Sequence, residues 1–161
     1  MVEFGRIYDE IAPKLTNYLV GSGSLYHDAC EIVQETFLRV WRHRDELMDD
    51  MEQVSGYVFT VARNLRKNLA RDSVRETLEP EIVDAGSYET DFDSKDENAM
   101  LRRRLLAALA ELPPTLREAF TLFQIGELSV REIARQTNET EANVKVRIHR
   151  AKERLRELLK S

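Results

Sequence analysis

The chain has 161 residues, of which 42% are hydrophobic and 33% charged, and its formal net charge at pH 7 is −5. A chain of this size can hold one ordinary domain or two very small ones. It lacks both an apolar run near the ~20 residues that a membrane span requires and the pattern of an N-terminal signal peptide. We therefore expect a cytoplasmic protein that does not insert into a membrane.

Cysteine and histidine, which often bind metals or act in catalysis, are few in this chain. The single cysteine, Cys30, cannot form an internal disulfide, and His27, His43 and His149 are widely spread along the chain. The sequence shows neither the spacing of a metal site nor a phosphate-binding glycine loop nor a nucleophile motif. We expect no cofactor, no metal and no enzymatic activity.

Apolar residues recur at helical spacing along most of the chain, and no stretch alternates with a period of two, which predicts an all-α fold. The first helix is expected over residues 4–20, where the breaker sequence GSGS follows. The second is expected over residues 25–47, with Trp41 on its apolar face, and the third over residues 51–71. Three amphipathic helices of this length can bury one shared core.

The helical pattern fails from Asp72 to about Glu97, where acids dominate. Residues 72–101 carry a net charge of −8, whereas residues 1–71 carry −2 and residues 102–161 carry +5. Like charges with few apolar residues are typical of a self-repelling, flexible linker. The sequence thus predicts two small helical domains, residues 1–72 and 98–161, joined by an acidic linker at residues 73–97.

The pattern of the C-terminal third is that of a helix-turn-helix. A helix over residues 98–110 is followed by Pro113 and Pro114, and Pro114 suits the first turn of a helix that runs to about Gln124 and ends before Gly126. Two further helices are expected over residues 130–136 and 141–159, with only TNET between them. A short helix, a tight turn and a longer basic helix form this DNA-binding motif.

The last of these helices has a buried face and a basic face. Its inward row is expected to be Val144, Ile148, Ala151, Leu155, Leu158 and Leu159. Thr140 suits the N-cap, accepting from a backbone N–H near Asn143, and the helix N-terminus attracts phosphate. Side chains near this end have the types that reach base edges or phosphates in a major groove. The candidate DNA contacts are Thr140, Glu141, Asn143, Lys145, Val146, Arg147 and Arg150.

A simpler interpretation of the basic helix is a solvated surface whose cations pair with Glu153 and Glu157. For a charged helix alone that interpretation would be preferred. The short helix and tight turn that precede it favour DNA binding.

Three blocks, in order and across nearly the whole chain, resemble the extracytoplasmic-function (ECF) group of bacterial sigma factors, the small two-domain promoter-specificity subunits of RNA polymerase. DACEIVQETFLRVWRHRDEL and VSGYVFTVARNLRKNLAR are similar to blocks of region 2 of that family. The stretch that begins LLAALAELPP and ends RLREL resembles its region 4. The resemblance implies an alternative sigma factor that directs transcription initiation through the minus-10 and minus-35 promoter elements.

The resemblance also assigns surfaces of region 2. It implies that the second helix docks on the clamp coiled coil of the polymerase's largest subunit through Asp28, Glu31, Gln34, Glu35 and Leu38. From the residues alone a solvated acidic face would be preferred, since charged stripes usually face water, and it is the resemblance that favours docking. It implies that the third helix holds unstacked minus-10 bases, which requires cations along the strand, through Arg63, Asn64, Arg66, Lys67, Asn68 and Arg71. We expect the neighbouring aromatics Tyr57 and Phe59 to be core residues.

The sequence departs from the family pattern at several positions. Asn68 stands where the family usually has aspartate, and DSVRE follows Arg71 in place of a run of arginines, which removes expected phosphate contacts. In the turn of the helix-turn-helix, Asn138 replaces a glycine, which is tolerable because asparagine adopts left-handed conformations. Glu139 replaces an apolar residue, and we expect it to face solvent or to pair with a cation such as Arg135.

The partners that the resemblance implies are core RNA polymerase, through the clamp coiled coil and the flap, promoter DNA and an anti-sigma factor. The alternative is a helix-turn-helix transcriptional regulator whose N-terminal helices dimerise or sense a signal and do not dock on polymerase. Such a regulator would bind a duplex operator without polymerase.

Overall fold

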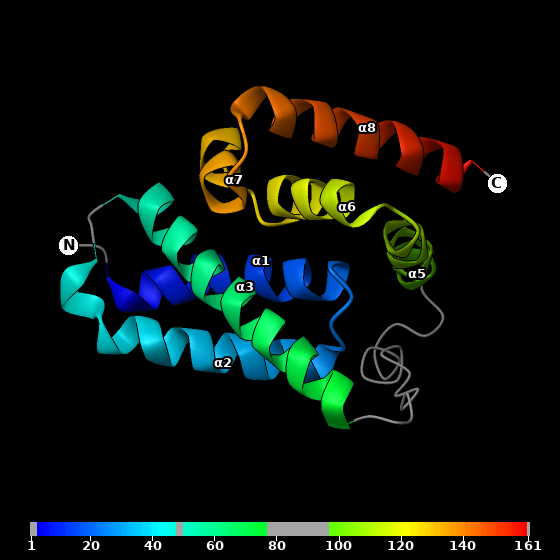
Figure 1. Ribbon diagram of the computed structural model, residues 1–161. Coiled ribbons are helices and arrows are strands. Elements are labelled where there is room, and N and C mark those ends of the chain that lie inside the picture. Colours follow the sequence, from blue (N-terminus) through cyan, green and yellow to red (C-terminus); the bar gives the residue numbers. More distant parts are fainter. Residues whose placement is uncertain (1–2, 48–49, 77–96, 161) are drawn as a thin grey trace.

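The computed structural model describes residues 3–47, 50–76 and 97–160 of the chain (Figure 1). All regular secondary structure within these ranges is helical, which confirms the predicted all-α fold. The larger part of the predicted acidic linker, residues 77–96, lies outside the described residues. Among the helices that are described, none is both long enough and apolar enough to cross a membrane.

The first half of the molecule, residues 3–76, consists of α1 (Phe4–Gly21), α2 (Tyr26–Arg42) and α3 (Met51–Glu76), which pack against one another. The breaker sequence ends α1 as predicted, because Gly23 adopts a positive φ of 108° that favours glycine. The α2 helix is shorter than predicted, since the backbone leaves the helical region at His43 and a short 3₁₀ turn follows at Arg44–Glu46. The α3 helix is longer than predicted and continues to Glu76.

The second half, residues 97–160, contains α5 (Glu97–Ala110), α6 (Pro114–Phe120), a π-helical segment η2 (Thr121–Ile125), α7 (Val130–Thr137) and α8 (Glu141–Leu159). Pro114 occupies the first turn of α6, as predicted. The α7 helix is capped by Ser129, whose hydroxyl accepts from the Glu132 N–H at 3.0 Å. Figure 1 shows α6 lying between α8 and α1.

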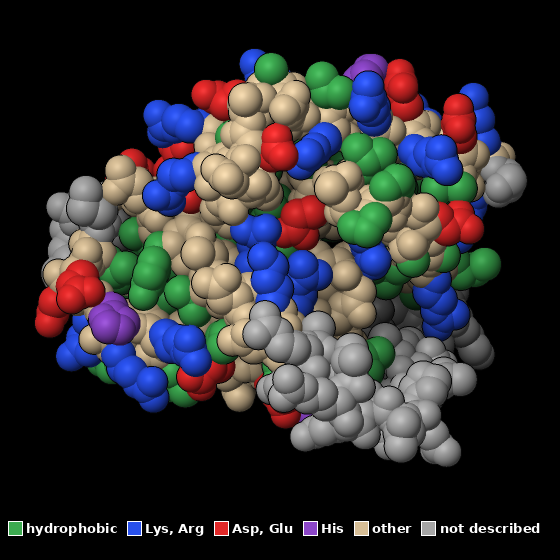
Figure 2. All heavy atoms as spheres, in the orientation of Figure 1, with side chains coloured by type: hydrophobic (Ala, Val, Ile, Leu, Met, Phe, Trp, Pro, Cys, Tyr) green, Lys and Arg blue, Asp and Glu red, His purple; other side chains and the backbone are tan. Residues whose placement is uncertain are grey.

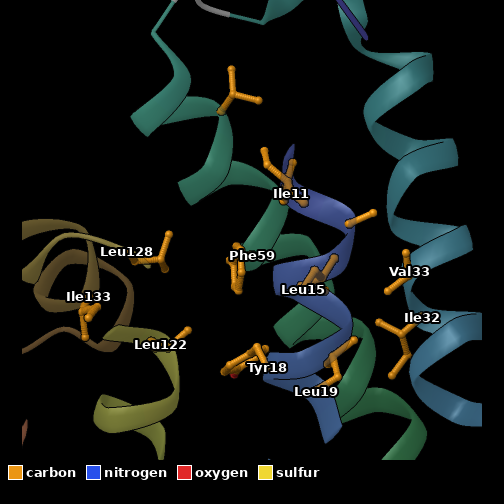
Figure 3. Packing of buried hydrophobic residues seen from close by; sticks show 14 of the residues in the cluster. Ile11, Leu15, Tyr18, Leu19, Ile32, Val33, Phe59, Leu122, Leu128 and Ile133 are labelled. Atoms are coloured by element: carbon orange, nitrogen blue, oxygen red, sulfur yellow. The ribbon is translucent and has the colours of Figure 1, made fainter. Parts of the chain in front are cut away.

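The two halves share one hydrophobic core. Its largest fully buried side chains include Leu15, Tyr18 and Phe59 from the first half and Leu122 and Ile133 from the second. Figure 3 shows these side chains converging from α1, α3 and the segments around α6 and α7. A smaller core, built around Leu109, Phe120, Ala151 and Leu155, lies entirely within the second half. The two halves are therefore packed together through apolar side chains.

Three glycines lie at the junction of the two halves, where the backbones approach closely. A methyl group on Gly21 would lie 3.0 Å from Ile125 Cδ1, and one on Gly126 would lie 2.9 Å from Phe59 Cε1. A methyl group on Gly56, in α3, would overlap the carboxylate of Glu132, in α7. The junction is close-packed because these positions carry no side chain.

Candidate nucleic-acid interface

The helix-turn-helix is formed by α7, the turn at residues 138–140 and α8. Asn138 has a φ of 57° and ends α7 in the left-handed conformation, as predicted. The hydroxyl of Thr140 accepts from the Asn143 N–H at 3.1 Å, which confirms the predicted N-cap. Asn138 thus ends α7 and Thr140 begins α8, with one residue between them.

The inward row of α8 is confirmed by its burial. Val144, Ile148, Ala151 and Leu155 are buried, and the predicted members Leu158 and Leu159 pack, partly buried, against the smaller core. The N-terminal part of this row joins the shared core, and its C-terminal part faces α5 and α6. This apolar row holds α8 with its opposite face outward.

The predicted minus-35 contacts lie together on that outward face and at the N-terminal end of α8. The side chain of Val146 is 44% exposed, and Arg147 is half-buried. The exposed members of the set are Thr140, Glu141, Asn143, Lys145, Val146 and Arg150. Figure 2 shows Lys and Arg side chains along α8.

Glu139 pairs with a cation as expected, but not with Arg135. Its Oε1 accepts from Arg147 Nη2 at 3.1 Å and its Oε2 accepts from Asn143 Nδ2 at 3.1 Å. Arg135 instead donates to Glu132, three residues before it on α7, at 2.7 Å, and this hydrogen bond raises the pKa of Arg135. Arg135 reaches Glu132 along its own helix, whereas Arg147 and Asn143 lie beside the turn.

The predicted minus-10 set divides into two groups. Asn64, Lys67 and Asn68 are exposed on α3, whereas Arg63 is buried and Arg66 is half-buried at the junction of the two halves. The side chain of Arg71 lies outside the described residues. Figure 2 shows Lys and Arg side chains gathered between the two halves as well as on α8.

Glu118, in α6, binds both arginines, and the sequence analysis did not single it out. Arg63 Nε donates to Glu118 Oε1 at 2.6 Å, and Arg66 Nη2 lies 3.5 Å from Oε2. The Tyr18 hydroxyl donates to the same Oε1 at 2.8 Å. Burial is the main cause that raises the pKa of Tyr18 above its ordinary value, and the nearby negative charge of Glu118 adds to it. The phenol therefore stays protonated.

Other polar contacts join the halves around this cluster. Arg117 donates to the Gly21 carbonyl at 2.9 Å, and burial lowers the pKa of Arg117. Ser129 Oγ and Arg131 Nη2 donate to Glu52 Oε1 at 2.7 and 3.2 Å, and these hydrogen bonds lower the pKa of Glu52. None of these partners is close in sequence, so no local pattern indicates them.

A cleft of about 860 Å³ is lined by the segment that follows α2, by the start of α3 and by α7. Tyr57 lies on its wall, with Glu52 and Arg131. Phe59 is fully buried, as expected, whereas Tyr57 is only partly buried against the shared core. The described residues provide no group of three or more His, Cys, Asp or Glu placed to hold a metal ion.

The predicted polymerase-docking residues form one stripe on α2. Glu31, Gln34 and Leu38 are exposed, with Leu38 at 51%, and Asp28 and Glu35 are half-buried. Trp41 lies at the C-terminal end of the apolar face of α2, and its side chain is 45% exposed. Its ring packs edge-on against Phe4 at 4.9 Å between centroids, and the Arg44 guanidinium lies 4.0 Å from the ring centroid.

Each half of the chain matches the model of a known protein family. Residues 7–76 match the model for sigma-70 region 2, and residues 102–155 match the model for sigma-70 region 4. Among curated proteins, the ECF RNA polymerase sigma factor RpoE of Cereibacter sphaeroides is 31% identical, over 96% of this chain and 84% of the relative. The ECF RNA polymerase sigma factor SigM of Bacillus subtilis is 28% identical, over 95% and 93%.

Solved structures show the same fold. The sigma factor RpoE of Bartonella quintana, in complex with the anti-sigma factor NepR, has a TM-score of 0.72 at 24% identity, over 98% of this chain and 96% of that one. CnrH, in complex with the cytosolic domain of CnrY, has a TM-score of 0.68 at 23% identity, over 97% and 86%. The order of the two regions, their match across the chain and the identity to curated relatives show that this chain belongs to the ECF group of RNA polymerase sigma factors.

Proposed function

We propose that this alternative sigma factor divides promoter recognition between its halves, with α3 binding the minus-10 element and α8 reading the minus-35 element. The observation that carries the proposal is the face of α8 that points away from its buried apolar row. Base-reading side chain types lie there at the capped N-terminus of the helix. A helix presented in this way fits a major groove.

For the minus-35 element we propose Thr140, Glu141, Asn143, Lys145, Val146, Arg147 and Arg150 as contacts. Arg and Lys suit guanine, Asn suits adenine, and an exposed valine suits the methyl group of thymine. Because Thr140 and the free amides of the first turn attract phosphate, this end of α8 can be positioned on the DNA backbone while the side chains reach the bases.

For the minus-10 element we propose that Asn64, Lys67 and Asn68 form the accessible part of the α3 surface. Arg63 and Arg66 are bound to Glu118 in the arrangement described above. Their guanidinium groups become available to a DNA strand only when α6 moves away from α3. We propose that binding to polymerase and promoter separates the halves, so that strand phosphates replace the Glu118 carboxylate.

For polymerase docking we propose the α2 stripe of Asp28, Glu31, Gln34, Glu35 and Leu38. An exposed leucine beside acidic side chains provides apolar contact together with charge complementarity. We propose residues 1–72 and 98–161 as the two functional units and residues 73–97 as the acidic segment between them, in which residues 73–76 continue α3 and Glu97 begins α5. In this scheme the chain binds core polymerase at the clamp coiled coil and the flap, acts in the cytoplasm and catalyses no reaction.

We also propose that an anti-sigma factor controls this protein. The support comes from similar chains, since RpoE of Bartonella quintana was solved with the anti-sigma factor NepR and CnrH with the cytosolic domain of CnrY. Both similarities extend over nearly the whole of this chain.

The docking proposal is tested by charge reversal on α2. We expect a triple variant, Asp28→Lys, Glu31→Lys and Glu35→Lys, to bind core polymerase at least about tenfold more weakly, because three lysines would remove the charge complementarity proposed for the acidic stripe. Co-purification and promoter-directed transcription with core polymerase are the measurements.

The matched control is Asp9→Lys, Glu10→Lys and Glu111→Lys, which makes the same change in net charge at exposed acids elsewhere. Undiminished transcription by the α2 variant would rule out this docking surface.

A further inference from the structure

We infer that Glu139 is a positioning residue for minus-35 readout, which orients Arg147 and Asn143 toward the base edges. The inference rests on the proposed role of α8. It assigns to Glu139 a function in base selectivity although Glu139 itself does not touch the DNA.

The position of Glu139 is fixed by its backbone. It follows Asn138, which ends α7 in the left-handed conformation, and its N–H donates to the Ala134 carbonyl at 2.9 Å. The next residue, Thr140, is the N-cap of α8. The carboxylate therefore projects from a fixed turn beside the first two turns of the recognition helix.

Both oxygens of the Glu139 carboxylate are engaged by predicted base-contacting residues. Arg147 Nη2 donates to Oε1 and Asn143 Nδ2 donates to Oε2, each at 3.1 Å. The side chains of Glu139 and Arg147 are 29% and 27% exposed, so the pair is partly shielded from water. A carboxylate accepts two donors from different turns of α8 and thereby restricts the rotamers of both.

These contacts leave the base-reading atoms of both side chains available. An ionised carboxylate only accepts hydrogen bonds, so the amide of Asn143 must present its NH₂ to Glu139. The second N–H and the carbonyl oxygen of Asn143 stay free, and this pair of groups reads adenine. Arg147 uses one of its five N–H donors on Glu139 and retains enough for a bidentate contact with guanine.

The charge of Glu139 adds a second effect. A carboxylate near the N-terminus of α8 repels phosphate and reduces attraction to DNA of any sequence. Removing it should increase non-specific binding while base discrimination falls. A residue that only stabilised the turn would not separate these two effects, because a loosened helix would lose affinity for every sequence.

The test uses the full-length protein with core polymerase on promoters with a constant minus-10 element and a randomised minus-35 element. Selection among transcribed promoters gives the base preference at each position for the wild type and the Glu139→Ala and Glu139→Gln variants. We expect Glu139→Ala to reduce discrimination at the bases read by Arg147 and Asn143 by about tenfold, the scale of one bidentate contact. Glu139→Gln keeps one acceptor oxygen and should give an intermediate loss.

The control background is Asn143→Ala with Arg147→Ala, in which Glu139 has nothing to orient. Adding Glu139→Ala there should change base preference less than about twofold, since interacting residues are not additive. Salt-dependent binding of each holoenzyme to a promoter with a scrambled minus-35 element should be unchanged or tighter without Glu139.

Unchanged base preference in Glu139→Ala, or an equal loss in both backgrounds, would overturn the inference while leaving α8 as the reading helix. Wild-type preference in Arg147→Ala and Asn143→Ala themselves would overturn the proposed reading role of α8 as well. If Glu139→Ala unfolds, Glu139→Gln takes its place. Its base preference is then compared with and without the Asn143→Ala and Arg147→Ala substitutions.

Discussion

At the scale of single residues, Glu118 makes the contacts that most affect how the two halves are held. Its carboxylate accepts from Arg63, Arg66 and Tyr18, three side chains of the other half. The side chain of Glu118 is 18% exposed and that of Arg63 is 11% exposed, so their charges are partly withdrawn from water. An ion pair in such a setting is costly to break from one side, because the remaining charges stay desolvated.

We expect Glu118→Ala to lower the free energy of unfolding by about 3 kcal/mol, since it leaves the buried Arg63 and the half-buried Arg66 without their carboxylate partner. Urea denaturation followed by circular dichroism measures this change. Glu111→Ala, at an exposed acid of the same half, should change the unfolding free energy by less than about 0.5 kcal/mol. Equal effects of the two substitutions would contradict the role given to the Glu118 cluster.

At the scale of helices, local sequence determined some boundaries well. The α8 helix has its predicted bounds, because Thr140 caps it and a regular apolar row continues to Leu159. The end of α2 was predicted too far along the chain, because helical spacing of apolar residues does not distinguish an α-helix from the 3₁₀ turn at Arg44–Glu46. The end of α3 was placed too early, because DSVRE is polar without containing a helix breaker.

Helical spacing does not predict how far Trp41 is buried. Trp41 lies on the apolar face of α2, one residue before the end of the helix, where it packs against Phe4 of α1 and remains 45% exposed. Burial at a helix end depends on where the neighbouring helices stop, and one amphipathic pattern does not contain that information.

The seating of α7 on α3 depends on Gly56. We expect Gly56→Ala to loosen the contact between these helices, because the added methyl group would overlap the Glu132 carboxylate, which hydrogen bonds from Arg135 and Gln136 hold in place. The same substitution should favour α3 itself by about 1 kcal/mol of helix propensity, so the first half should keep its fold. The predicted result is a larger radius of gyration by small-angle X-ray scattering, with helix content retained.

Two further variants test this explanation. Gly5→Ala is the matched control, since nothing lies within 4 Å of the added methyl group. Adding Glu132→Ala to Gly56→Ala makes room for the methyl group and should restore most of the compactness. A Gly56→Ala protein as compact as the wild type would show that the α3–α7 contact does not hold the halves together.

At the scale of the whole molecule, the sequence indicated two helical regions and their family but not how they pack. Arg63 and Glu118 are 55 residues apart, and neither has a local feature that identifies the other as a partner. The glycines at the junction were likewise not predicted as packing sites, because their role depends on side chains from the opposite half. The packing explains why Arg63 and Arg66, which resemble DNA contacts in sequence, are occupied within the chain.

The outward face of α8 and the α2 stripe remain accessible in this arrangement, whereas part of the α3 surface is covered. In our account, promoter binding therefore begins with exposed surfaces, and the arginines at the junction contribute after the halves separate. Each surface acts within one complex with core polymerase, so the account as a whole depends on sigma-directed transcription.

The most direct test is run-off transcription with core RNA polymerase on a library of promoters, with and without this protein. We expect transcripts that require the protein and that start from a subset of promoters sharing one minus-10 and one minus-35 sequence. The same transcripts should be lost from promoters in which either element is scrambled. The absence of any transcript that depends on the protein, from any promoter in the library, would contradict the account.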